Sequence, residues 1–313
     1  MNTTRWLAYA QLVRLPNVFS ALADIGLGLC VTHSLTASAW SSGSAWLWTG
    51  LFTASGSLYM SGMVWNDIFD RHEDARSRPY RPLPSRRVSL RTAVLLATFL
   101  LIIGMSSGWA VAVGQGTHSL LAWHNSGLMA TVLAVLILLY DGVLKATWLG
   151  PLLMGGCRLA NVLLGLSLLD PQALPDMERV YVASVVGVYI VGVTWLARRE
   201  ESRSARHQLL LAVGVIGLAL LLALFLPACL PERLGTFWFP YLLVAFAFYL
   251  ADPVYQAIRR PEPYLVQAAV TRCLRGLIVL DALLASVFAG LPALLLVLLL
   301  LPARWLGKWV YAT

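Results

Sequence analysis

Four side chains with oxygen ligands stand at helical spacing in one short stretch of the chain. Asp70 and Asp74 follow Asn66 at intervals of four residues, and Asp67 lies three residues before Asp70. Residues spaced in this way share one face of a helix, where stacked like charges are destabilising unless a cation lies between them. Carboxylate oxygens suit Mg²⁺, which proteins commonly share with substrate phosphates. The spacing therefore predicts that these four residues bind Mg²⁺.

A stiff loop with two arginines follows the acidic residues. In the sequence RPYRPLP, Arg78 and Arg81 alternate with three prolines, and each proline fixes the local backbone. Guanidinium groups on such a loop are well suited to bind phosphate through paired N–H groups. Arg78 and Arg81 are therefore candidate phosphate ligands. The alternative for the whole stretch 66–81 is a solvated loop of mixed charge that anchors the helix end at lipid headgroups.

Long apolar segments surround these charges. Of the 313 residues, 59% are hydrophobic and only 12% are charged, whereas a soluble domain carries about 25% charged residues. So few charges cannot cover the surface of a water-soluble protein of this size. The composition excludes a soluble enzyme, a disordered chain and a nucleic-acid-binding protein, although the net charge is +8. It predicts a multi-pass integral membrane protein, located in the inner membrane if the source is bacterial.

The pattern of apolar runs predicts an all-α, polytopic bundle of about nine transmembrane helices, in a single domain that covers residues 1–313. A span needs about 20 apolar residues, and continuous apolar runs without alternation exclude a membrane β-barrel. The predicted spans are residues 16–34, 46–66, 90–113, 120–140, 149–169, 179–197, 207–229, 235–252 and 278–301.

The positions of the basic residues predict the orientation of this bundle. If the N-terminus is cytoplasmic, 18 of the 23 Lys and Arg residues fall on the cytoplasmic side. Cytoplasmic loops of membrane proteins carry such an excess of positive charge. The acidic residues and the two loop arginines lie on the same face, so a polar site is expected there.

The stretch from Asn66 to Ser85 resembles the first signature of the UbiA superfamily of intramembrane prenyltransferases. That signature reads N-D-x-x-D-x-x-x-D followed by R-P-x-R-P-[LIV]-P-S, and every defining position is present. The resemblance implies a nine-helix bundle around a cavity that opens to lipid. It also implies that Mg²⁺ ions at the cytoplasmic end hold a prenyl diphosphate, which loses its diphosphate and is attacked by an aromatic or other lipophilic acceptor.

A second region, residues 140–165, also resembles the superfamily. Tyr140 and Lys145 correspond to the tyrosine and lysine after the fourth span, where the lysine faces the diphosphate. The resemblance thus implies that Lys145 acts with Arg78 and Arg81 as the catalytic cations, and that Tyr140 contacts substrate. The string MGGCRxxN within this region is most similar to the EboC-like subgroup.

Three further polar residues are candidate substrate ligands. Arg158 and Asn161 share one helical face inside the fifth predicted span, where an arginine is costly and usually functional. Asn17, near the start of the first span, matches a position at which family members often place a polar residue facing the cavity. The alternative for Arg158 is a structural ion pair, with Asp24 or with Asp281.

The chain departs from the superfamily at the second acidic motif, D-x-x-x-D, near the end of the sixth span. The corresponding stretch, TWLARREESRSARHQ, contains no aspartate and offers only the adjacent Glu200 and Glu201. Adjacent residues on a helix point about 100° apart and cannot replace an i, i+4 pair. One glutamate could bind a single metal ion, the neighbouring arginines could replace a metal, or the diphosphate chemistry could be lost.

Two hypotheses follow from this departure. The first is an Mg²⁺-dependent prenyltransferase, with a prenyl diphosphate, a lipophilic acceptor and membrane lipid as its partners. The second is a non-catalytic UbiA-like membrane protein that binds or transports a lipophilic metabolite or precursor. The intact first signature favours the enzyme; the prenyl chain length, the acceptor and the oligomeric state stay open.

Overall fold

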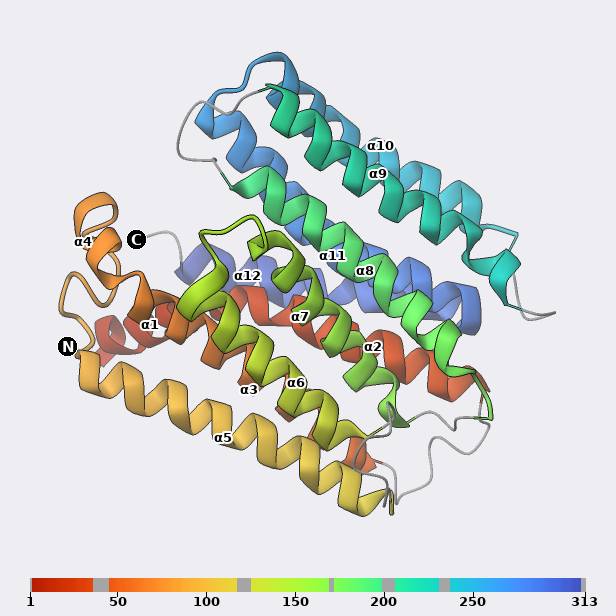
Figure 1. The fold of residues 1–313 in the computed structure, drawn as a ribbon, viewed down its shortest axis with the longest axis horizontal. Helices are drawn as coiled ribbons and strands as arrows, with labels where there is room; N and C mark the ends of the chain where they lie inside the picture. Colours follow the sequence, from red (N-terminus) through yellow and green to blue (C-terminus); the bar gives the residue numbers. More distant parts are fainter. Residues whose placement is uncertain are drawn as a thin grey trace.

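The computed structural model describes residues 2–35, 45–116, 125–168, 172–198, 206–230 and 237–310, and within these ranges it contains only helices and turns (Figure 1). This confirms the all-α fold class. The long helices are α2 (Val18–Leu35), α3 (Ala45–Phe69), α5 (Leu90–Gly114), α6 (Ser126–Leu139), α7 (Gly150–Gly165), α8 (Asp176–Ala197), α9 (Arg206–Cys229), α10 (Phe239–Arg259) and α11 (Pro263–Ala289). The shorter ones are α1 (Asn2–Leu12), α4 (Arg71–Ser77) and α12 (Leu300–Val310).

Most of these helices form because the chain would otherwise expose unpaired backbone N–H and C=O groups to lipid. Among the described residues, eight stretches are long and apolar enough to cross a membrane. Seven of them contain α2 and α5 to α10, and the eighth is Leu291–Val310. Helices α3 and α11 have 25 and 27 residues, enough to cross a hydrocarbon core of about 30 Å at 1.5 Å per residue. They carry more polar side chains, and they pack inside the same bundle.

The ninth predicted span, 278–301, was wrong in its boundaries. The helix that contains its first half is α11, which begins at Pro263 and ends at Ala289. Gly290 follows with φ +68°, a left-handed backbone value that ends an α-helix, and Pro292 comes two residues later. The rest of the segment is a 3₁₀ stretch, Leu291–Leu299, which leads into α12.

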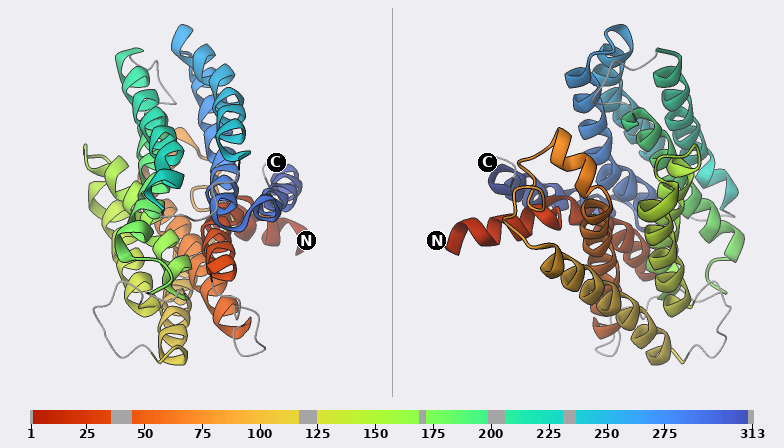
Figure 2. Two further views of the ribbon diagram at one scale, coloured as in Figure 1. Left: turned by 90° about the vertical axis from the view of Figure 1, so that its right-hand side faces the viewer. Right: turned by 60° about the vertical axis from the view of Figure 1, so that its left-hand side comes forward.

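Each long helix packs against the next along the chain, and α11 returns to pack against α2. The nine helices therefore form a closed circuit (Figures 1 and 2). The largest contacts across its middle join α2 with α7 and α8 with α11, and α3 also contacts α6 and α7. The buried core lies along α2, α7, α8 and α11, whereas α5 and the segment Leu291–Val310 are the most exposed of the candidate spans. Polar side chains on α2, α7 and α11 are thereby enclosed by apolar ones.

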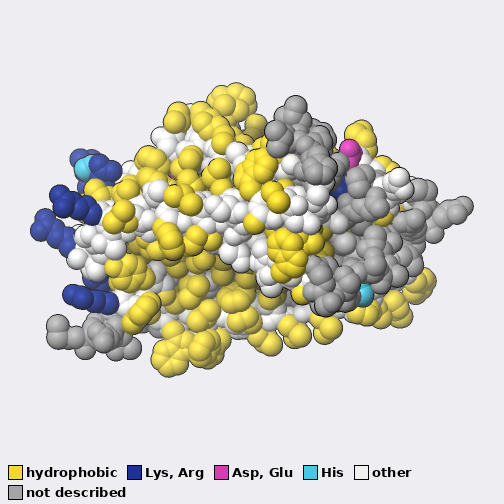
Figure 3. Space-filling view, turned by 90° about the horizontal axis from the view of Figure 1, so that it is seen from below, with side chains coloured by type: hydrophobic (Ala, Val, Ile, Leu, Met, Phe, Trp, Pro, Cys, Tyr) yellow, Lys and Arg dark blue, Asp and Glu magenta, His cyan; other side chains and the backbone are white. Residues whose placement is uncertain are grey.

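One end of the bundle carries most of the described charge. Helix α4 and the proline-rich loop after it lie at this end, close to the N-terminal helix α1 (Figure 1). In the space-filling view, Lys and Arg side chains gather at one end, while hydrophobic side chains cover most of the middle (Figure 3). The separation suits a protein whose middle lies in lipid, and it places the acidic stretch at a polar end, as the sequence predicts.

Candidate functional site

The acidic residues lie where α3 passes into α4. Asp70 separates the two helices, but the helical hydrogen bonds continue: the backbone N–H groups of Asp70, Asp74 and Arg78 each donate to the carbonyl four residues earlier. Asn66, Asp70 and Asp74 therefore stay on one side of a nearly continuous helical path. Asn66, Asp67 and Asp74 are buried, at 8%, 5% and 4% relative exposure.

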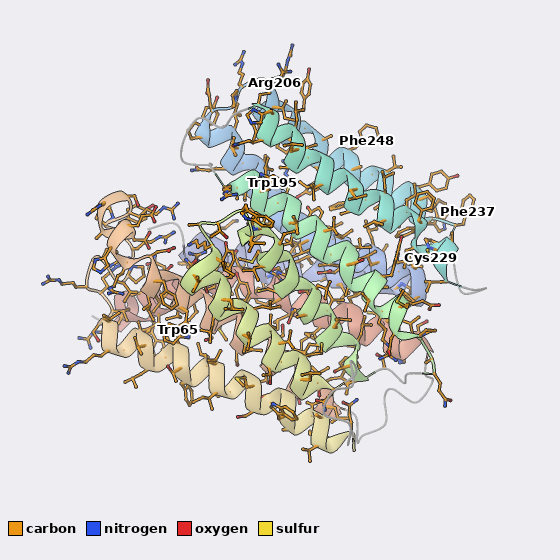
Figure 4. The ribbon with its side chains drawn as sticks, in the orientation of Figure 1. Trp65, Trp195, Arg206, Cys229, Phe237 and Phe248 are labelled. Carbon is orange, nitrogen blue, oxygen red and sulfur yellow. The ribbon has the colours of Figure 1, made fainter. Side chains whose placement is uncertain are left out.

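A small hydrophobic cluster holds this end of α3 in place. Val64 and Ile68 point away from the acidic side and pack against Leu12 of α1 and Val88, just before α5. Trp65 stacks on Phe69 with ring centroids 5.7 Å apart. In Figure 4, Trp65 lies near the end of α3 that leads into α4. Apolar packing on one side of α3 thus fixes the direction of the polar side.

Arg81 turns back from the proline-rich loop onto the carboxylates. Its Nη1 donates to both oxygens of Asp74, at 3.0 and 2.7 Å, and reaches Asp67 Oδ1 at 3.5 Å. Two backbone hydrogen bonds hold the loop in a folded conformation: Arg81 N–H donates to the carbonyl of Arg78, and Val88 N–H donates to the carbonyl of Pro82. Arg78 itself is the C-terminal cap of α4 and is half-buried.

Arg14 is a second cation at this site, and our sequence interpretation missed it. Its Nη2 lies 3.2 Å from Asp67 Oδ1. Arg14 stands between α1 and the 3₁₀ turn Leu15–Asn17 and has φ +47° and ψ +49°, a left-handed conformation uncommon for a residue other than glycine. The only local signal was the proline two residues later, because the contact with Asp67 spans 53 positions in sequence.

Lys145 is a third cation at this site, and it comes from a distant part of the chain. Its Nζ donates to Asn66 Oδ1 at 2.8 Å and also contacts Asp70 Oδ2. Asn66 Nδ2 donates to the same Asp70 oxygen at 3.2 Å. The five residues before Lys145, Tyr140–Leu144, form a π-helical turn, a widening typical of functional sites. The lysine that the resemblance implies therefore meets the acidic stretch.

A second polar group lies deeper in the bundle. Arg158 Nη1 pairs with Asp24 Oδ2 at 3.1 Å, and its Nη2 donates to Ser20 Oγ at 2.8 Å. Asn161 Nδ2 donates to the same Asp24 oxygen at 2.7 Å and to the carbonyl of Ala21 at 2.9 Å. Asp24 and Asp281 were the ion-pair partners considered for Arg158 from the sequence, and in the structure Arg158 forms its ion pair with Asp24. The two predicted ligands Arg158 and Asn161 are thus brought together.

Tyr59 of α3 connects the deeper group with the acidic end. The guanidinium of Arg158 lies 5.7 Å from the centre of the Tyr59 ring, and Tyr59 lies seven residues before Asn66 on the same helix. Asn17 is exposed at the start of α2, and Tyr140 is half-buried at the end of the fourth predicted span. The predicted substrate ligands therefore belong to one polar region with two parts: the deeper group, and the part near the acidic end of α3.

The carboxylates are engaged by these cations in the structure. Among the described residues, no group of three His, Cys, Asp or Glu side chains is arranged to hold a metal ion. The donor set still has the right chemistry, since Asn66, Asp67, Asp70 and Asp74 offer the hard oxygen ligands that Mg²⁺ prefers. Glu200 and Glu201 lie outside the described residues, whereas Arg198 donates to the carbonyl of Ala146 at 3.0 Å.

Comparison with known proteins identifies the family. The model of the UbiA prenyltransferase family matches residues 27–270. The chain belongs to the UbiA prenyltransferase family. Members of this family are integral membrane proteins, and the helices described above agree with a multi-pass arrangement. The predicted superfamily and membrane location are thereby confirmed.

Curated relatives of this UbiA-family chain include two archaeal proteins named digeranylgeranylglyceryl phosphate synthase. The protein of Saccharolobus solfataricus is 33% identical over 99 residues, which are 32% of this chain and 33% of the relative. That of Ignicoccus hospitalis is 30% identical over 174 residues, 55% of this chain and 50% of the relative. The chain thus spans between a third and a half of these relatives. The names of these relatives do not refer to the EboC-like subgroup, so membership of that subgroup stays a prediction.

Solved structures share the fold. A UbiA homologue from Archaeoglobus fulgidus bound to GPP and Mg²⁺ superposes with a TM-score of 0.64 at 12% identity, covering 92% of this chain and 99% of that one. A structure described for digeranylgeranylglyceryl phosphate synthase in membranes gives 0.61 at 19% identity, with coverage of 91% and 99%. At these identities the likeness establishes the UbiA fold.

Proposed function

We propose that this protein transfers a prenyl group from a prenyl diphosphate to a lipophilic acceptor inside the membrane, with Mg²⁺ as cofactor. The observation that carries the proposal is the meeting of Arg14, Arg81 and Lys145, from three separate segments, at the acidic end of α3. A bound diphosphate needs such a group of cations. The archaeal relatives named as synthases, and the homologue bound to GPP and Mg²⁺, support the same function.

The acidic residues would hold the cofactor. Asn66, Asp67, Asp70 and Asp74 fit Mg²⁺ by their ligand type, and bound Mg²⁺ would neutralise charge that develops on the leaving diphosphate. The oxygens of these residues accept hydrogen bonds from Lys145, Arg14 and Arg81 in this structure. The same cations can serve either the carboxylates or a phosphate, since their N–H groups recognise both.

The chain's own residues would assist bond cleavage as follows. The allylic C–O bond of the prenyl diphosphate breaks, and its electron pair leaves with the diphosphate. Lys145, Arg78 and Arg81 stabilise the departing anion by charge and hydrogen bonding. The acceptor then forms a bond to the allylic carbon and gives up a proton, while the apolar helices keep water from the carbocation. Asn17, Tyr140, Arg158 and Asn161 would contact the substrates.

The test is a reconstituted transfer assay. Purified protein in liposomes is given geranylgeranyl diphosphate with geranylgeranylglyceryl phosphate, and then with a panel of other prenyl diphosphates and lipophilic acceptors. We expect diphosphate release and a prenylated lipid that both require Mg²⁺. Asp70→Asn should abolish release. Glu73→Gln is the matched control, because Glu73 is exposed on the adjoining helix α4 and should retain wild-type activity.

The alternative function is binding or transport of a lipophilic metabolite without chemistry. The pairing of every signature aspartate with a cation, together with the absence of the second D-x-x-x-D motif from the sequence, favours it. Under this alternative no prenyl diphosphate of any chain length is turned over, although lipophilic compounds still bind. Absence of Mg²⁺-dependent release across the panel would therefore overturn the transferase proposal.

A further inference from the structure

The segment after α11 runs back along α2 to the end of the bundle that holds the acidic residues. Leu291–Val310 is antiparallel to α2, since its later residues meet earlier residues of the chain. The contacts join Leu296 with Gly26, Gly307 with Pro16, and the carbonyl of Val310 with the side-chain amide of Gln11, at 2.8 Å. Helix α12 therefore lies beside α1 and the turn Leu15–Asn17, at one edge of the bundle (Figure 2).

This course decides on which side of the membrane two basic residues lie. Nine spans that begin in the cytoplasm would leave Arg304 and Lys308 on the opposite side. A segment that returns along α2 brings them to the side of α1, where the sequence places 18 other basic residues. This agrees with the excess of positive charge on the cytoplasmic segments of membrane proteins.

The depth of these two cations follows from the same contacts. The first candidate span begins at Leu15, and Gly307 lies level with Pro16. Arg304 and Lys308 are three residues and one residue away from Gly307, which corresponds to about 5 Å or less along the helix axis. Both cations therefore lie at the boundary between lipid and water.

One face of α12 combines these cations with tryptophans. Its exposed residues recur at intervals of three and four, which places them on one side of the helix: Leu301, Arg304, Trp305, Lys308 and Trp309. Trp305 and Trp309 are 61% and 65% exposed, and their rings meet edge to face with centroids 6.4 Å apart. Within the described part of the chain, neither Arg304 nor Lys308 has a hydrogen-bond or ion-pair partner. The face thus presents two unpaired charges beside two indole rings.

Helix α1, which contacts α12, exposes the same two kinds of side chain. They are Arg5 and Trp6, both exposed. Neither α1 nor α12 contains an aspartate or glutamate that could pair with these cations. Their charge is therefore open to an anion from outside the two helices.

We propose that the exposed face of α12, together with Arg5 and Trp6 of α1, binds the headgroups of anionic phospholipids in the cytoplasmic leaflet. Indole rings favour the depth of the headgroups. Each lysine or arginine near the membrane surface raises the affinity for anionic lipid about fivefold. Phosphatidylglycerol supplies a phosphate without an ammonium group, whereas phosphatidylcholine is zwitterionic and offers the cations no net charge.

Quenching of a fluorophore on α12 measures the lipid preference at this face. Leu301→Cys is placed in a full chain without the native cysteines, labelled with NBD and reconstituted into phosphatidylcholine liposomes. A fixed mole fraction of spin-labelled phosphatidylglycerol, or of spin-labelled phosphatidylcholine, is included as the quencher. We expect an association constant for phosphatidylglycerol at least about fivefold that for phosphatidylcholine. Equal quenching by the two lipids would overturn the proposal.

Substitutions on α12 assign the preference to its cations. The pair Arg304→Gln and Lys308→Gln should lower the ratio of the two association constants about fivefold, because both charges are lost. Arg304→Lys keeps the charge and should keep the preference, which separates loss of charge from local misfolding. Arg206→Gln is the matched control, because Arg206 is an exposed arginine at the start of α9, across the bundle from α12 (Figure 2). A wild-type ratio in the paired variant would contradict the assignment.

Two further measurements test the partner and the membrane side, and neither depends on prenyl transfer. Shielding of the label from both lipids, with disulfide crosslinks between unlabelled Leu301→Cys copies, would show that a second chain covers α12 and would overturn the lipid assignment. Lys308→Cys, in the same background, should react with an impermeant maleimide on inverted vesicles and not on intact cells. Reaction on intact cells would place α12 on the opposite side and contradict the cytoplasmic assignment.

Discussion

At the scale of single residues, the site depends on a few cations that hold several oxygens each. Lys145 contacts both Asn66 and Asp70, and Arg81 contacts both Asp67 and Asp74. Each pair is partly buried, so its hydrogen bonds are less weakened by water than those of a surface ion pair. The same property makes these side chains sensitive to substitution, because a lost partner leaves an oxygen without its donor.

Lys145→Met tests the role of the lysine. We expect diphosphate affinity to fall about tenfold or more, since one charge-assisted contact is lost, while the fold stays intact because Lys145 is half-exposed. Calorimetric titration of a prenyl diphosphate with Mg²⁺ measures the affinity, and circular dichroism measures helix content. Unfolding of the variant would indicate a structural lysine instead.

Arg14→Gly tests the strained residue at the first turn. Glycine adopts φ +47° without the steric cost of a side chain, which is about 1 kcal/mol, but it removes the contact with Asp67. We expect unchanged or slightly higher thermal stability together with a large loss of transfer activity. Arg86→Gly is the matched control, because Arg86 also has positive φ, +58°, and is exposed. Equal activity in both variants would exclude Arg14 from the site.

At the scale of elements, close helix contacts determine where the polar residues meet. Helix α2 approaches α7 through glycine: a Cβ on Gly28 would lie 2.2 Å from the backbone of Gly165. Small residues at such crossings let membrane helices approach closely. This contact lies one turn beyond Asp24 on α2 and one turn beyond Asn161 on α7, so it holds the two side chains of the deeper group within 2.7 Å.

Gly28→Ala is therefore expected to be strongly destabilising. The added methyl group meets backbone that cannot move aside, and overpacking of a dense interior costs about 1–3 kcal/mol or more. Thermal unfolding in detergent should show a clear drop in midpoint. Gly217→Ala on α9, where a Cβ meets nothing within 4 Å, should be neutral or stabilising by about 1 kcal/mol. Similar midpoints for both variants would show that the α2–α7 contact is loose.

At the scale of the whole molecule, the distribution of charge predicts the orientation in the membrane. Helix α4 and the adjoining arginines should face the cytoplasm, and the start of α8 should face the opposite side. Cysteines introduced at Arg76 and Asp176, both exposed, in a background without the native cysteines, test this. An impermeant maleimide should label only Asp176→Cys on intact cells and only Arg76→Cys on inverted vesicles; the reverse pattern would invert the topology.

Much of the fold could be predicted from local patterns of residues. Continuous apolar runs can be accommodated in lipid only as helices, so the all-α bundle and most span boundaries could be derived from residue order. The acidic site could also be predicted, because Asn66, Asp70 and Asp74 are spaced four residues apart and therefore lie on one face of a single helix. The end of α11 could not be predicted in this way, since Gly290, with its positive φ, divides a run that is apolar on both sides.

Which distant residues meet depends on how the helices pack in three dimensions. Arg14 and Lys145 lie 53 and 75 positions from the aspartates they contact, and periodicity carries no information about such pairs. The choice of Asp24 as the partner of Arg158, and the place of Asp281 beside it, likewise depend on how α2, α7 and α11 cross. Local spacing fixes which side chains share a helix face, whereas contacts between helices depend on packing across the whole bundle.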